Sequence, residues 1–153
     1  MTAILRLLAA LVLLSPPAAA QTRGECVDGA LWWAEGRVAA LGPCEAPEEG
    51  FFVLACEAGT VTADAPFPVG AEEGAAATAT LDVDGRAFPL EGLGATFPLT
   101  GVTGLGGAPL PDAALDALAA GRLATLDTEA GPVEIHLTGS AAAIRAMRAA
   151  CGE

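Results

Sequence analysis

The chain contains no lysine, tyrosine or asparagine, and His136 is the only histidine among its 153 residues. Its seven basic residues are all arginines; they face 19 acidic residues, and the formal net charge is −12 at pH 7. Such an acidic protein repels phosphate backbones and anionic headgroups. The sequence therefore predicts no nucleic-acid partner and no docking to anionic lipid.

The residues that nucleophilic and metal chemistry require are equally scarce. Ser140 is the only serine after residue 20, and its place before a helical pattern marks it as an N-cap rather than a nucleophile. No C-x-x-C pair offers zinc spacing. The D-V-D-G stretch at 82–85 is explained by a hairpin turn, because the twelfth position of a calcium loop would be Leu93. We expect no enzyme activity, no metal and no cofactor.

The longest apolar run, residues 7–14, is too short for a membrane helix, which needs about 20 apolar residues. It follows Arg6 and precedes a Ser-Pro-Pro break and an alanine-rich A-x-A site at 18–20. This order is typical of a secretory signal peptide over residues 1–20, cleaved before Gln21. The predicted mature chain, 21–153, is the size of one domain. With six arginines against 19 acids it carries a charge of −13, and it has no segment for membrane insertion.

The four cysteines, Cys26, Cys44, Cys56 and Cys151, all lie in the predicted exported part. In an oxidising compartment an even number of cysteines predicts two disulfides, with three possible pairings. A three-residue loop at 34–36 would place Cys26 opposite Cys44 across a hairpin, which leaves Cys56 for Cys151. A two-residue turn would shift this register by one and remove the argument.

Short apolar runs separated by turn residues predict a mainly β chain. Asp84-Gly85 stands between two alternating runs, which predicts a two-residue hairpin with Leu81 opposite Phe88. Further hairpins are expected in 30–41, 51–64 and 122–137, and His136 is expected on a solvated strand face. The Gly/Pro-rich segment 100–111 is expected to be a loop.

Two helices are predicted near the end of the chain. The first covers 112–120 with Asp112 as its cap, and the second runs from the cap Ser140 to just before Gly152. Ile144, Met147 and Cys151 form one apolar stripe on the second helix, so this face should pack on the body of the protein. We therefore expect an antiparallel β-sandwich or open barrel with a short helix and a C-terminal helix, held by two disulfides.

Trp32 and Trp33 are neighbours on a predicted strand, so one ring faces the core and the other faces outward. An outward tryptophan is a candidate for stacking on a sugar or on a partner protein.

Three stretches carry a resemblance: L-A-C-E-A-G at 54–59, an L-x-x-G-R-L step at 118–123, and L-T-G-S-A-A-A-I at 137–144 before the last cysteine. With the leader, this layout resembles small exported bacterial proteins of the invasion-associated locus B type and periplasmic accessory proteins of type VI secretion. The resemblance implies a β-sandwich, a periplasmic address and no catalytic centre.

These observations leave three interpretations open. The first, which we adopt, is a non-enzymatic periplasmic or secreted protein that binds or scaffolds another envelope protein. The second is a small-ligand or glycan binder that uses an exposed tryptophan, and the third is a hydrolase with an unrecognised carboxylate site.

Overall fold

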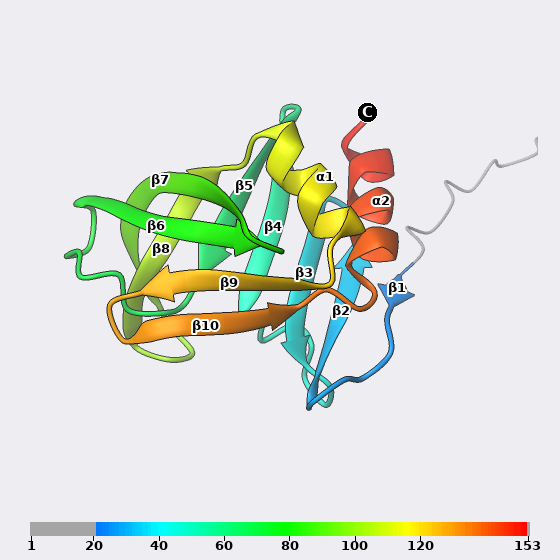
Figure 1. The fold of residues 1–153 in the computed structure, drawn as a ribbon, viewed down its shortest axis with the longest axis horizontal. Helices are drawn as coiled ribbons and strands as arrows, with labels where there is room; N and C mark the ends of the chain where they lie inside the picture. Colours follow the sequence, from blue (N-terminus) through cyan, green and yellow to red (C-terminus); the bar gives the residue numbers. More distant parts are fainter. Residues whose placement is uncertain (1–20, 153) are drawn as a thin grey trace, which may run out of the picture.

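The structure is a computed structural model and describes residues 21–152, so the signal peptide predicted for residues 1–20 lies outside it. Ten strands form one antiparallel sheet in the spatial order β1-β2-β3-β4-β5-β8-β7-β6-β9-β10 (Figure 1). The strands are β1 (Thr22–Arg23), β2 (Ala30–Glu35), β3 (Val38–Pro43), β4 (Phe52–Glu57), β5 (Thr60–Ala65), β6 (Ala76–Val83), β7 (Arg86–Phe97), β8 (Val102–Pro109), β9 (Leu123–Thr128) and β10 (Gly131–His136).

The sheet curls into a half-barrel because one long strand belongs to both of its halves. β7 has 12 residues; its first part pairs with β6 and its last part, from Leu93 to Phe97, pairs with β8. In Figure 1 the strands β6, β9 and β10 run across the direction of β2 to β5. The predicted fold class is confirmed, in its open-barrel form.

The core lies between these two halves of the sheet. Trp32, Phe52 and Leu54 come from the first half, and Leu81, Leu126 and Ile135 come from the second; all six are fully buried. The Trp32 indole N–H donates a hydrogen bond of 2.7 Å to the His136 carbonyl oxygen. This bond joins β2 to the end of β10 across the open side of the barrel.

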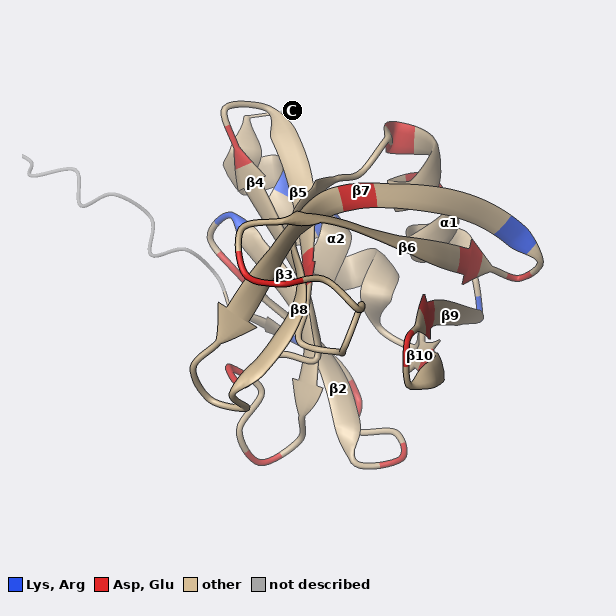
Figure 2. Cartoon of the chain, turned by 90° about the vertical axis from the view of Figure 1, so that its left-hand side faces the viewer, with Lys and Arg blue, Asp and Glu red and all other residues tan. Residues whose placement is uncertain are grey.

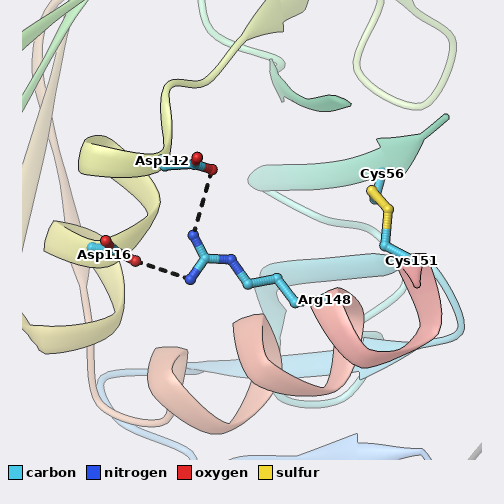
Figure 3. A network of polar contacts seen from close by, with 5 residues as sticks. All are labelled: Cys56, Asp112, Asp116, Arg148 and Cys151. Atoms are coloured by element: carbon cyan, nitrogen blue, oxygen red, sulfur yellow. Dashed lines mark hydrogen bonds and ion pairs between the residues drawn. A yellow bond between two sulfur atoms is a disulfide. The ribbon is translucent and has the colours of Figure 1, made fainter. Parts of the chain in front are cut away.

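The helix α2 (Ser140–Cys151) packs against β2, β3 and β4 and carries the predicted stripe. Ile144 and Met147 are buried, and Cys151 is bonded to Cys56 of β4 (Figure 3). Arg148 reaches from α2 to helix α1 (Asp112–Ala120), where its guanidinium lies 2.9 Å from Asp116 and 3.9 Å from Asp112. A disulfide and an ion-pair network thus hold the terminal helix from two sides.

Both helix caps differ from the prediction. The cap residues are Pro111 for α1 and Gly139 for α2, and neither helix has a side-chain cap. Ser140 is instead the first residue of α2, fully buried, with its hydroxyl 2.7 Å from the carbonyl oxygens of both Leu118 and Leu137. Its hydroxyl therefore contacts a carbonyl oxygen in the last turn of α1 rather than an N–H of its own helix.

Both predicted disulfides are present, although the register used to derive the first was wrong. Glu35 pairs with Val38, so the turn contains only Gly36 and Arg37 rather than a three-residue loop. Gly36 has φ +54° as the first of these two residues, a position where such turns favour glycine. A tight turn at Asp28-Gly29 folds the preceding chain back alongside β2. Cys26 reaches Cys44 because Cys44, just after β3, lies beside this turn.

The segment predicted as a Gly/Pro loop at 100–111 contains the interior strand β8. A Cβ on Gly104 would lie 2.2 Å from the Ala65 carbonyl oxygen, and one on Gly106 would lie 2.5 Å from the Ala95 Cβ. These glycines therefore allow β5 and β7 to approach β8 closely where the sheet bends. The sequence pattern alone is typical of a loop.

Candidate functional site

No group of three or more metal-ligating side chains converges within residues 21–152. No helix in this part of the chain has the length and apolar character needed to cross a membrane. Candidate sites are therefore surface hollows.

The two predicted binding tryptophans occupy opposite faces of β2. Trp32 is completely buried and packs edge-to-face on Phe52, with ring centroids 6.5 Å apart. Trp33 is half-buried on the outer face. Of the two, only Trp33 presents part of its ring to solvent, and Trp32 serves the core.

Trp33 lines a hollow of about 190 Å³ between β1, β2 and the β3–β4 turn. The charged side chains around this hollow are Arg23, Glu35, Glu45 and Glu48. The Gln21 amide donates to Glu35 at 2.9 Å, and Arg23 lies 3.4 Å from the Cys44 carbonyl oxygen. The Trp33 indole N–H is itself buried and has no hydrogen-bond partner in the described chain.

His136 is not the solvated strand residue that the sequence predicts. Its side chain is half-buried, and both ring nitrogens are covered without a hydrogen-bond partner among the residues described. The alternation along β10 is as predicted, with Ile135 buried and Glu134 exposed, but His136 on the Glu134 side is only partly exposed. Ser140, the only serine in the described residues, holds its hydroxyl against two backbone carbonyl oxygens.

A second hollow, of about 180 Å³, is mostly apolar. We call it the apolar hollow; its apolar walls are Phe51, Pro66, Phe97, Pro98 and Leu99. Leu99 is 77% exposed and Phe51 is 39% exposed. Large exposed apolar side chains gathered at one hollow are typical of an interaction site.

The apolar hollow cannot be recognised from the sequence, because its walls come from three separate segments. Phe51 follows the β3–β4 turn, Pro66 follows β5, and Phe97 to Leu99 form the end of β7 and its turn. The one local signal is the F-P-L-T-G stretch at 97–101, where two large apolar residues stand at a turn.

The two hollows share the β3–β4 turn, residues 44–51. Pro47 and Glu48 line the Trp33 hollow, whereas Glu49, Gly50 and Phe51 line the apolar hollow. This turn contains three glutamates and no basic residue, and the adjacent turn 98–101 is uncharged. In Figure 2 the turns at the lower end of the molecule are correspondingly coloured red rather than blue.

Comparison with known proteins gives no match of the chain to a protein-family model, to a curated protein or to a solved structure.

Proposed function

We propose that this protein is an exported, non-enzymatic envelope factor that binds another protein through the apolar hollow. The observation that carries the proposal is the exposure of Leu99 and Phe51 beside Phe97 on a rigid β scaffold. Apolar anchors of this kind are the usual centres of protein interfaces. The acidic charge disfavours nucleic acid and anionic membranes as the occupant, which supports a protein partner.

Export is supported by the leader-like residues 1–20 and by the two disulfides, which form and persist in oxidising compartments. The resemblance to periplasmic accessory proteins agrees with this address. Intact-mass measurement of the secreted protein should show a chain that begins at Gln21. Retention of Met1 would contradict the export step.

Docking is tested with a photo-cross-linking residue placed at position 99 or, as the control, at position 93. Leu93 is also an exposed leucine, at 55%, but it does not line the apolar hollow. In cells that produce the protein naturally, position 99 should cross-link to one defined protein and position 93 should not. The purified partner should then bind Leu99→Asp at least about tenfold more weakly than Leu93→Asp. Equal binding of both variants would refute docking at this hollow.

Trp33 supports a second candidate function, the binding of a small ligand or glycan. Its partly exposed ring lies beside Arg23 and Glu35, and sugar sites combine an aromatic face with polar groups. A glycan array should then show binding that Trp33→Ala abolishes. An array without a hit that depends on Trp33 would remove this candidate.

A further inference from the structure

Two neighbouring glutamates of the β3–β4 turn are not neutralised by the described residues: Glu49, which lines the apolar hollow, and Glu48, which precedes it and lines the Trp33 hollow. Glu48 and Glu49 are exposed, and neither carboxylate has a hydrogen-bond or ion-pair partner in the part of the chain described. Other acids are engaged: Glu35 accepts from Gln21, and Asp112 and Asp116 face Arg148. The turn 44–51 therefore presents uncompensated negative charge directly beside an apolar hollow.

Arg23 is the basic side chain that comes closest to this turn in the described interactions. Its guanidinium is directed at the Cys44 carbonyl oxygen, at the start of the turn, and lies on the side of the Trp33 hollow. Glu49, on the side of the apolar hollow, has no such neighbour among the lining residues, which are otherwise uncharged.

We infer that the partner segment seated in the apolar hollow carries arginine or lysine beside its apolar anchor. The inference rests on the proposed function and adds the charge of the partner to it. An apolar side chain fills the hollow between Phe51, Phe97 and Leu99, while a flanking cation lies over Glu48 and Glu49. Complementary charge at an interface rim favours the right partner and penalises an acidic one.

The same charge disfavours a second copy of this chain as the occupant. Each exported copy, residues 21–153, carries six arginines and 19 acidic residues, and two apolar hollows placed face to face would bring their glutamate-rich turns together. Like charges opposed across an interface are costly. A basic protein segment is the occupant that fits both the apolar walls and the rim.

The test uses three acetylated, amidated hexapeptides that differ only in their end residues. They are Arg-Gly-Leu-Phe-Gly-Arg, its Gln-ended form and its Glu-ended form. Each is titrated into the isotope-labelled, exported protein while backbone amide resonances are followed by NMR. We expect the Arg peptide to shift the amides of Gly50, Phe51 and Thr100 and to bind about fivefold more tightly than the Gln peptide, as two exposed ion pairs would allow. This preference should shrink as salt is added.

Two double variants distinguish the effect of Glu48 and Glu49 on peptide binding from the effect of the protein's overall charge. Glu48→Gln/Glu49→Gln should bring the Arg and Gln peptides to equal affinity, whereas Glu57→Gln/Glu91→Gln, which removes the same charge at two other exposed sites, should preserve the preference. Leu99→Asp should abolish the shifts from all three peptides.

Each other outcome counts against the inference. Equal affinity of the three peptides for the unmodified protein, with Leu99→Asp still blocking them, would keep the docking site and overturn its charge preference. If both double variants lose the preference for the Arg peptide over the Gln peptide to the same extent, that preference comes from the overall charge of the protein and not from Glu48 and Glu49. If no peptide shifts the hollow's amides, the charge inference fails, and the cross-linking comparison at positions 99 and 93 still decides docking independently.

Discussion

Trp32 and Trp33 are neighbours in the sequence, but only one of their two indole N–H groups has a hydrogen-bond partner among the described residues. Trp32 donates to the His136 carbonyl oxygen, whereas the buried Trp33 N–H finds no acceptor in residues 21–152. Leaving a buried donor unpaired costs about 1–3 kcal/mol. Trp33→Phe removes that donor and keeps most of the ring, so the free energy of unfolding should stay level or rise by up to about 1 kcal/mol.

Urea unfolding of Trp33→Phe and of its control Trp32→Phe measures the contrast. Trp32→Phe loses both a hydrogen bond and core volume, so it should destabilise the protein by about 2–3 kcal/mol. If Trp33→Phe destabilised the protein as much as Trp32→Phe, the Trp33 N–H would have a partner after all.

Glycine is required at position 104 by backbone atoms of a neighbouring segment rather than by the local conformation of β8. An added Cβ would lie 2.2 Å from the Ala65 carbonyl oxygen and 2.8 Å from the Phe67 nitrogen, both of them backbone atoms that do not yield easily. Gly104→Ala should therefore lower the free energy of unfolding by about 3 kcal/mol.

The matched control is Gly101→Ala. Gly101 has φ +67° but nothing within 4 Å of an added Cβ, so the variant should lose only about 1 kcal/mol through backbone strain. Thermal and urea unfolding of both variants give the comparison. A smaller loss at Gly104 than at Gly101 would mean that the sheet relaxes at its bend.

Among the elements, those with local causes were predictable from the sequence. Asp84 and Gly85 both have positive φ, at +49° and +87°, and the hairpin has the predicted pairing of Leu81 with Phe88. The stripe on α2 likewise follows from its own spacing. β8 could not be predicted, because its glycines are required by close contacts with Ala65 and Ala95 on the adjacent strands, and the local sequence does not show these contacts.

The disulfide pairing was predicted correctly from a hairpin register that the structure does not have. Cys44 lies beside Gly29, whose carbonyl oxygen accepts the Cys44 N–H at 3.0 Å. The turn at Asp28-Gly29, and not the turn at Gly36-Arg37, is therefore the reason that Cys26 reaches Cys44.

The two disulfides should differ in their contribution to stability. Cys26–Cys44 spans 18 residues and Cys56–Cys151 spans 95. In the chain-entropy model such loops give about 3 and about 4.7 kcal/mol, respectively. The longer one also holds α2, whose Ile144 and Met147 are buried. Cys151→Ser should therefore lower the melting temperature more than Cys44→Ser does, as measured by calorimetry.

Cys56→Ser and Cys26→Ser are the matching controls, since each pair of variants breaks the same bond from its other end. The reverse order of melting temperatures in both pairs would show that packing around the first hairpin outweighs loop closure.

At the scale of the whole molecule, the sequence predicted an antiparallel β-sandwich or open barrel, which the half-barrel confirms in its second form, but it did not predict the apolar hollow. Alternating strands and close turns are local patterns, and together they imply an antiparallel sheet. The hollow depends on the meeting of Phe51, Pro66 and Phe97, which are separated along the chain and brought together by the curl of the sheet. Of the two predicted binding tryptophans, the structure leaves Trp33 at the surface, with its hollow next to the apolar one.

An open barrel has two edges, and each needs protection from pairing with other chains. One edge is β1, which has only two residues. The other is β10, where Pro132 offers no N–H, Glu134 is charged and exposed, and the His136 carbonyl oxygen is taken by Trp32. Proline and charge on an edge strand are the devices by which native sheets prevent association.

Removing both devices should therefore make the protein associate through β10. In Pro132→Val/Glu134→Val the edge strand gains an N–H and loses its charge, and we expect the molar mass from light scattering to rise with protein concentration relative to the unmodified protein. The control is Thr80→Val/Thr125→Val, on β6 and β9, which are paired on both sides at these positions. It adds apolar surface without changing an edge, so its molar mass should match that of the unmodified protein. If both double variants associate alike, added hydrophobicity rather than the opened edge is responsible; if neither does, the bond from Trp32 and the twist of β10 protect the edge without Pro132 and Glu134.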